Sequence, residues 1–453
     1  MHGPPRWRML LLVHAFSIRL LVSRPLLSGT TRRTALMGAL RRGLHDMAGG
    51  FPRTYWVLWI GTLVNRLGSF VVPFLALYLT RERGFTVERA GLVVSLYGVG
   101  AVIASPLGGM LADRVGRRIT LAGGLWMGSI GMVCLGFARD PIAISVAAFC
   151  LGIMGEVYRP AVSAAVADIV SPEERQRAFG LLYWVINVGF AISVPMAGLM
   201  VRYGYLTLFI ADALTTFTYG CVIWFMLPET RPARASKQDT SEPSAAGSLL
   251  APFRDPAFLA FAVPIFGVSV IFYQSQVALP MDLSARGLTE AQFGTVLAVN
   301  GALIVLLQPF TGRVLRHLRR AQALAIAAAL TGLGFGLHSV SAHMGIAACA
   351  VAVWTLGEML QAPVAPSIVA DLAPSGLRGS YQGAYHMLWG MASGTAPALG
   401  GWLLGRAGSS SLWMTCLALG IVCAAWQLAI ADSRRRRLDA QRSLRTDLSP
   451  LVD

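Results

Sequence analysis

GGMLADRVGRR, residues 108–118, lies between two long apolar runs of the chain. This short stretch holds three glycines, three arginines and one aspartate. A solvated turn would explain the arginines, but it would not explain Gly109 and Asp113 at these positions. The stretch is therefore either an ordinary polar loop or a part with its own role in the protein's function, and the surrounding sequence must decide between them.

The composition is that of a protein with many membrane spans. Apolar residues make up 55% of the 453 residues, charged residues only 13%, and the mean hydropathy is +0.60. Soluble domains average about 25% charged residues, and a soluble chain of this length could not bury so much apolar surface. The formal net charge of +16 comes from arginines placed between apolar runs, a pattern typical of membrane topology rather than of nucleic-acid binding.

The six cysteines all lie inside apolar runs. They form no CxxC pair and have no histidines at metal-ligand spacing. The sequence therefore predicts small buried apolar side chains and neither disulfides nor a metal site. The cysteines are Cys134, Cys150, Cys221, Cys349, Cys416 and Cys423.

Twelve segments are apolar enough to cross a bilayer as helices, each of which needs about 20 residues. The sequence thus predicts an all-α integral membrane protein. Residues 228–256, rich in Pro, Ser and charge, are interpreted as a flexible cytoplasmic linker that separates six spans from six. The predicted spans are residues 55–79, 90–112, 119–138, 142–167, 178–202, 206–227, 257–281, 291–314, 321–340, 344–371, 381–405 and 411–431.

Arginine-rich loops predict the orientation of the chain in the membrane. They follow the second, fourth, eighth and twelfth spans, and with the linker and the first segment they all fall on one side. The positive-inside rule then places both termini in the cytoplasm. Residues 1–50 are interpreted as a basic extension that follows from a mis-assigned start, and residues 433–453 as a basic cytoplasmic tail.

An internal repeat relates the two sets of six spans. RGFTVERAG (83–91) aligns with RGLTEAQFG (286–294) at a shift of 203 residues. Because six is an even number, the two repeats enter the membrane in the same sense, which predicts parallel six-helix bundles over residues 51–227 and 257–432. The same shift pairs Pro106 with Pro309, Gly109 with Gly312, Arg117 with Arg320, Asp168 with Asp371 and Arg175 with Arg378, and a shift of 202 pairs Glu156 with Glu358 and Pro195 with Pro397.

Twelve spans, parallel halves and a basic turn after the second span resemble the major facilitator superfamily, over about residues 51–432. The resemblance implies a transporter whose halves rock about a midplane site, with the turn closing the cytoplasmic gate. Gly109 would let a helix approach closely, and Asp113 would meet Arg117 or the positive N-terminus of the eleventh span. In the second half Arg316 replaces the aspartate, so the gate is expected to act from the first half. The superfamily signature G-x-x-x-D-R-x-G-R-R is matched by Gly109, Asp113, Arg114, Gly116, Arg117 and Arg118.

A second motif resembles the Gly-rich Pro-x-x-Gly pattern of the drug/proton antiporters. It occurs in the fifth span as GFAISVPMAG (189–198) and more fully in the eleventh as GMASGTAPALGG (390–401), although Val194 replaces the usual glycine before the proline. Small residues and prolines of this kind allow close helix packing and bending. The residues concerned are Gly189, Pro195, Gly198, Gly394, Pro397, Gly400 and Gly401.

Polar and ionisable side chains inside the spans are the candidates for proton coupling and substrate binding, because charges there cost about 2.5–3.5 kcal/mol each. Low dielectric disfavours a charged carboxyl group, so three acidic side chains are proton-carrier candidates. The two arginines would tune a carboxylate or bind an anionic group. Alternatively, Glu156–Arg159 and Arg66–Asp212 are fixed ion pairs that hold helices together. The candidates are Asn65, Arg66, Glu156, Arg159, Asp212, Glu358 and Gln361.

Two further groups of residues have a more ordinary interpretation. Asp168 and Asp371 end their spans, and they can pair with Arg175 or Arg378 across the cytoplasmic turns, which favours a structural role. Aromatic side chains within the spans either pack the helices or line an apolar cavity for lipophilic compounds. These aromatic residues are Tyr97, Tyr158, Tyr183, Trp184, Tyr273, Trp354 and Trp389.

The leading hypothesis is a secondary transporter of a bacterial plasma (inner) membrane that exports small lipophilic compounds or drugs in exchange for protons. The alternative is a proton-coupled importer of a sugar, organic acid or peptide. A membrane receptor or enzyme is a third, distant hypothesis, because no P-loop, HExxH, GxSxG or paired histidines occur. The expected partners are a small-molecule substrate, protons and the lipid bilayer, with no nucleic acid or cofactor, and a monomer is expected.

Overall fold

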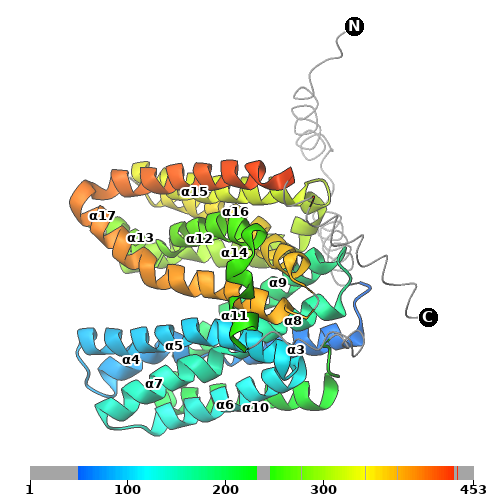
Figure 1. Cartoon of the computed structure of the whole chain (residues 1–453). Helices are drawn as coiled ribbons and strands as arrows, with labels where there is room; N and C mark the ends of the chain where they lie inside the picture. The colour runs from blue at the N-terminus through cyan, green and yellow to red at the C-terminus, as the bar shows by residue number, and fades with distance from the viewer. Residues whose placement is uncertain are drawn as a thin grey trace, which may run out of the picture. The chain divides into compact units, whose positions relative to one another are not determined.

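The computed structural model describes residues 49–231, 245–276, 278–341, 343–374, 376–432 and 436, and every regular element within them is helical (Figure 1). The predicted extension, the middle of the predicted linker and the predicted tail lie almost entirely outside these residues.

Helices of the first half follow one another with short connections. A Thr86 side chain caps the start of α5 and Asp140 caps that of α7, because their oxygens accept free backbone N–H groups of the first turn. The elements are α3 (Arg53–Leu67), α4 (Val71–Arg81), α5 (Val87–Arg114), α6 (Arg117–Phe137), α7 (Pro141–Glu156), α8 (Tyr158–Ile169), α9 (Arg175–Met200), the 3₁₀ turn Val201–Tyr203 and α10 (Tyr205–Met226).

Helices of the second half repeat this order after a short helix that ends the predicted linker. The side chain of Asp255 caps α12, and Thr289 and Gln292 form a capping box at the start of α14. The elements are α11 (Ala245–Arg254), α12 (Pro256–Tyr273), α13 (Ala278–Ala285), α14 (Glu290–Leu315), α15 (Arg320–Leu337), the 3₁₀ turn His338–Val340, α16 (Met344–Leu372) and α17 (Arg378–Ala429).

The described helices account for the twelve predicted spans. Within the described residues, ten helical segments are long and apolar enough to cross a membrane. One of them, α17, runs for 52 residues and changes direction at Gly408 (φ 78°, ψ 171°), so it contains the eleventh and twelfth spans. The first span is divided into α3 and α4, which are too short to cross separately. The seventh span is likewise divided into α12 and α13, so both halves begin with an interrupted helix.

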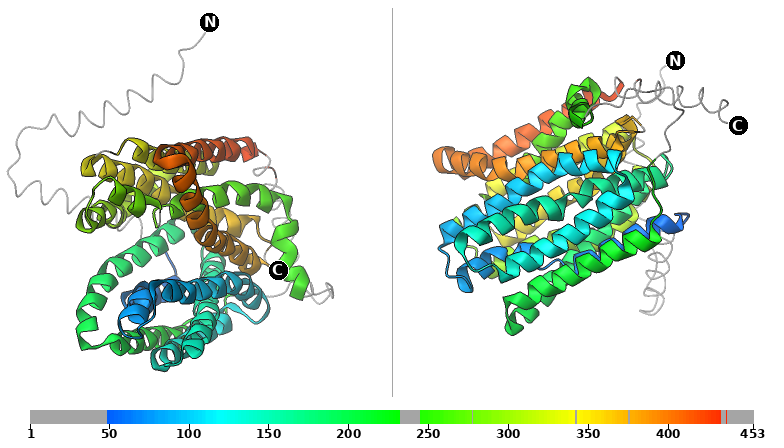
Figure 2. Two further views of the ribbon diagram at one scale, coloured as in Figure 1. Left: turned by 90° about the vertical axis from the view of Figure 1, so that its left-hand side faces the viewer. Right: turned by 60° about the horizontal axis from the view of Figure 1, so that its bottom comes forward.

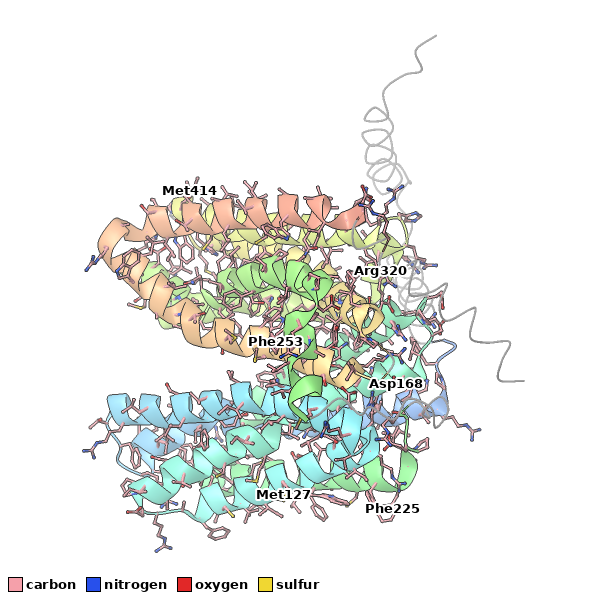
Figure 3. The ribbon with its side chains drawn as sticks, viewed as in Figure 1. Met127, Asp168, Phe225, Phe253, Arg320 and Met414 are labelled. Carbon is pink, nitrogen blue, oxygen red and sulfur yellow. The ribbon has the colours of Figure 1, made fainter. Side chains whose placement is uncertain are left out.

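Apolar side chains cover the outer surfaces of the helices. Figure 3 shows Met127 and Phe225 on one outer face and Met414 on another, and Phe225 is 80% exposed. Helices that expose such side chains suit the hydrocarbon core of a membrane. There, the backbone N–H and C=O groups must form their hydrogen bonds within the helix.

Each half has apolar core clusters of its own. One cluster is built from residues between Phe70 and Phe209, and two others from residues between Phe258 and Cys416. Figure 2 shows the helices of the first half (blue to green) gathered apart from those of the second (green to red). The halves meet where α5 and α8 pack on α17, and where α9 packs on α14 and α16.

Candidate functional site

Helices α5 and α17 cross at glycine residues. A Cβ atom on Gly109 would collide with the backbone carbonyl of Gly379, and a Cβ atom on Gly383 would collide with that of Ser105. Only glycine permits this approach of two backbones. The repeat partner Gly312 has open space around it, so the second half makes no equivalent crossing there.

Asp113 caps the start of α17 from the other half of the chain. Its carboxylate accepts hydrogen bonds from the backbone N–H of Gly379 (2.8 Å), the backbone N–H of Ser380 (2.6 Å) and the hydroxyl of Ser380 (2.8 Å). These are first-turn N–H groups with no partner inside α17, and a negative charge there is favoured by the helix dipole. Arg117 adds an ion pair at 3.0 Å, and the carboxylate is buried.

An ion-pair network continues from Arg117. The guanidinium group of Arg117, which is fully buried, donates to Asp168 at 2.9 Å. Asp168 in turn pairs with Arg378 of the second half. The aspartate therefore links a basic residue of its own half with one from the other half.

The second half contains a copy of this network. Asp371 pairs with Arg320 of its own half and with Arg175 of the first half. The three residues are the repeat partners of Asp168, Arg117 and Arg378, respectively. The two aspartates therefore form reciprocal ion pairs between the halves. Asp168 pairs with Arg378, which follows Asp371 in sequence, and Asp371 pairs with Arg175, which follows Asp168.

All these contacts lie at one end of the helices, which we name the basic end. Figure 3 shows Asp168 and Arg320, from different halves, at this end. The described residues that connect the helices at the basic end are 115–116, 170–174, 316–319, 373–374 and 376–377.

Glu229 stabilises the turn before α6, although no motif in the sequence marks it. Its carboxylate accepts the backbone N–H groups of Arg117 (2.9 Å) and Arg118 (3.2 Å), at the start of the helix. Gly116 has φ 117°, which other residues rarely adopt, and a Cβ atom there would collide with Glu229.

The other arginines of the turn have different surroundings. Arg118 donates to the backbone carbonyl of Trp224, and its guanidinium group lies 4.7 Å from the centre of the Trp224 ring. Arg114 is exposed, and its backbone carbonyl accepts a hydrogen bond from Arg231. Glu229 and Arg231, at the start of the predicted linker, thus form hydrogen bonds with the backbone after and before this turn, respectively.

Asn65 and Arg66 belong to a buried polar network within the first half. Arg66 donates to the hydroxyl of Tyr158 at 2.9 Å, and this hydroxyl donates to Asn65 at 3.2 Å. Asn65 also donates to Thr216 at 2.9 Å. The Nε atom of Arg66 is buried and has no hydrogen-bond partner among the described residues.

The interpretation of Arg66 and Asp212 as a direct ion pair is corrected by the structure. Asp212 is buried and accepts the backbone N–H groups of Phe70 and Val71, both at 3.0 Å. These N–H groups are exposed by the interruption of the first span, at the start of α4. The carboxylate therefore caps a helix end, for the same electrostatic reason as Asp113.

Glu156 and Arg159 form the ion pair that their one-turn spacing predicts. Glu156 Oε2 lies 2.5 Å from Arg159 Nε, and the hydroxyl of Tyr97 donates to Glu156 Oε1 at 2.7 Å. The two side chains differ in accessibility: 43% of the Arg159 side chain is exposed, against 13% for Glu156.

Glu358 lies in α16 at the boundary between the halves. Asn300 of α14 donates to its carboxyl group at 2.8 Å and to Thr355 at 3.1 Å. The hydroxyl of Tyr183, from α9 of the first half, lies beside the carboxyl group but makes no hydrogen bond of ordinary geometry. Among the described residues no basic side chain pairs with Glu358. Gln361 is buried one turn further along the helix.

The glycines of the antiporter-like motif divide into two groups. A Cβ atom on Gly189 would collide with Arg66, and one on Gly400 would collide with Gln274, so these two glycines permit close contacts. Gly198, Gly394 and Gly401 have open space instead. Pro195 and Pro397 lie within the continuous helices α9 and α17.

The site residues that sequence reasoning missed are polar neighbours without a motif. Asn300, Ser380 and Glu229 each contact a predicted residue from a distant part of the chain. No local spacing marks them, although Asn300 within an apolar run was a signal for a functional polar residue.

Comparison with known families identifies the class of protein. The sequence model of the family described as Major Facilitator Superfamily matches residues 58–394 of this chain and, in a second match, residues 276–452. The chain therefore belongs to this superfamily of transporters and is a multi-pass membrane protein.

Bacterial relatives match most of the chain. An uncharacterized MFS-type transporter, YttB of Bacillus subtilis, is 27% identical over 83% of this chain and 95% of its own. A Na(+), Li(+), K(+)/H(+) antiporter of Planococcus maritimus is 26% identical over 69% of this chain and 80% of its own. Multidrug resistance protein MdtH of Aeromonas salmonicida is 24% identical over 81% and 92%.

Solved structures share the fold at low sequence identity. The human organic anion transporter MFSD10 (TETRAN) has a TM-score of 0.67 and 17% identity, covering 83% of this chain and 99% of its own. A bacterial homologue of the iron transporter ferroportin, in its outward-facing state, has a TM-score of 0.69 and 13% identity, covering 84% and 100%. At these identities the likeness shows the fold alone.

Proposed function

We propose that the protein exports small lipophilic compounds in exchange for protons, with its two halves alternating in access. The proposal goes beyond membership of the transporter family, because it names the driving ion, the direction and the type of substrate. The names of two relatives, a multidrug resistance protein and a cation/H(+) antiporter, are consistent with it.

The environment of Glu358 is the observation that carries the proposal. This carboxyl group is held by Asn300 and adjoins Tyr183 of the other half, so a motion between the halves changes its surroundings. Without a basic partner nearby, its charged form is costly in the membrane, and it can gain and lose a proton during the cycle. Glu156 is the weaker candidate, because Arg159 stabilises its charged form.

Contacts at the basic end support alternating access. Asp113 and the reciprocal ion pairs of Asp168 and Asp371 join the halves at this end. If the arginine-rich loops face the cytoplasm, as the positive-inside rule predicts, these contacts close the protein on the cytoplasmic side. The described conformation would then be the outward-facing one.

Transport by purified protein in liposomes tests the proposal. We expect N-phenyl-1-naphthylamine, a neutral lipophilic dye, to move against its gradient when a pH gradient is imposed and to stop moving when the gradient is collapsed. Glu358→Gln is expected to abolish the gradient-driven movement and to leave the size-exclusion profile unchanged. Glu82→Gln, at an exposed position after α4, is the matched control and is expected to behave like the wild type.

Other outcomes would contradict the proposal. Equal transport with and without a pH gradient, by both the wild type and Glu358→Gln, would rule out proton coupling. Movement of a sugar or peptide into the liposomes together with protons, in the absence of dye export, would favour the importer. Glu156→Gln is expected to slow transport but to keep its dependence on the gradient.

A further inference from the structure

We propose that the preferred substrates are small organic anions with an aromatic body, and that Arg159 binds their acidic group. The inference rests on the proposed transport function and narrows its substrate class. It depends on the geometry around Arg159, whose side chain is accessible, unlike the buried arginines Arg66 and Arg117.

The guanidinium group of Arg159 has unused donors. Its Nε atom pairs with Glu156, but its two terminal nitrogen atoms have no hydrogen-bond partner among the described residues. The side chain is nevertheless accessible, unlike that of Arg66, which is buried and bonded to Tyr158. A planar fork of free N–H groups matches the two oxygens of a carboxylate, or two oxygens of a sulfonate.

Glu156 orients the guanidinium group of Arg159 through its Nε atom and leaves the two terminal nitrogen atoms free. One carboxylate oxygen accepts from Arg159 Nε and the other accepts from the hydroxyl of Tyr97. Both oxygens of Glu156 are therefore used, and the guanidinium group is held in one orientation. An incoming anion can bind to the terminal nitrogen atoms without displacing Glu156.

Arg159 faces the second half of the protein. Ser163, one turn later in α8, shares a hydrogen bond of 3.1 Å with His386 of α17. The charge of Arg159 also acts on His386 and on Tyr273 of α12. A ligand on Arg159 would therefore contact both halves, which a substrate must do to be passed between two orientations of the halves.

Aromatic side chains next to this position suit an aromatic ligand. The rings of Tyr273 and Trp389 lie 6.1 Å apart at 69°, and those of Phe272 and Trp389 lie 5.7 Å apart at 75°. All three side chains are only partly buried, so that faces of the cluster stay available for ring stacking. Among the described residues, the acidic group that contacts Arg159 is Glu156, and both of its oxygens already accept hydrogen bonds, so it leaves no free acceptor for a cationic drug.

Binding of two matched probes tests the inference. 2-Naphthalenesulfonate is anionic at all working pH values, whereas 2-naphthalenesulfonamide has the same ring system and is neutral. Isothermal titration of the purified full-length protein is expected to show about 10- to 100-fold tighter binding of the sulfonate, the range of charge-assisted hydrogen bonds. Arg159→Gln should remove this preference, and Arg159→Lys should retain only part of it.

Controls separate a lost site from a lost fold. The double variant Glu156→Gln, Arg159→Gln removes both charges together, and it is expected to keep the wild-type melting temperature while losing the preference. Arg139→Gln, at an exposed position before α7, is expected to keep the preference. Equal binding of the two probes by the wild type, or a preference that survives in Arg159→Gln, would overturn the inference.

The inference and the proposed function fail in different ways. If the pH gradient drives export of the neutral dye while the sulfonate has no advantage in binding, the anion site is wrong and the transport function stands. If the sulfonate binds in an Arg159-dependent manner but no pH gradient moves it or the dye, the anion site stands and proton-coupled export is wrong.

Discussion

The turns after α5 and after α14 are copies of one repeat, yet they make different contacts. In the first copy, Gly109 lies against the backbone of α17 and Asp113 caps that helix. In the second copy, Gly312 has open space and the exposed Arg316 replaces the aspartate. The comparison shows that the basic end is joined asymmetrically, by a helix cap that, among the described residues, only the first half provides.

The ion pairs around these turns are symmetric by contrast. Asp168 and Asp371 each link their own half to the other, with the repeat-related arginines in the same roles. An ion pair needs only opposite charges at helix ends, which both repeats keep. The helix cap also needs a close backbone crossing, and a single large side chain would prevent that.

The largest expected effect comes from placing a large side chain at Gly109, where α5 crosses α17. Gly109→Leu should reduce transport more than about 100-fold, because its side chain meets a backbone that cannot move aside without separating α5 from α17. Gly312→Leu should leave the rate near that of the wild type. Initial rates in liposomes measure both, and equal losses in the two variants would remove the asymmetry.

Loss of a reciprocal ion pair should have the next largest effect. Asp168→Asn removes the acidic partner of Arg378 and one of the two acidic partners of the buried Arg117, and breaking a buried ion pair costs about 3–5 kcal/mol. Asp371→Asn should cost less, because its partner Arg320 is 25% exposed whereas Arg117 is fully buried. Melting temperatures and transport rates of the two variants test the order, and a larger loss in Asp371→Asn would contradict it.

The smallest effect is expected from removing the negative charge of Asp113, the residue that caps α17. Asp113→Asn keeps the shape of the side chain but leaves one oxygen instead of two to accept hydrogen bonds from α17, so transport should slow by about tenfold without a change in substrate preference. Arg316→Gln at the repeat position is the control and should have no effect. An unchanged rate in Asp113→Asn would return the turn to the status of an ordinary loop.

Local spacing predicted some side-chain contacts correctly. Glu156 and Arg159 are one helical turn apart, so their ion pair follows from the geometry of a single helix. The alternative of an ion pair between Arg66 and Asp212, which are far apart in the chain and not related by local spacing, was wrong. Asp212 caps α4, and the sequence did not predict that the first span is interrupted before that helix.

Length and apolarity were enough to predict an all-helical membrane protein, and the internal repeat at a shift of 203 residues was enough to predict two repeated halves. Membrane spans need a minimum length of apolar chain, so their number can be counted from the sequence. The partners of Asp168, Asp371 and Glu358 could be seen only in the packed structure. These partners lie on helices far apart in the chain, and their proximity depends on how the two halves pack against each other.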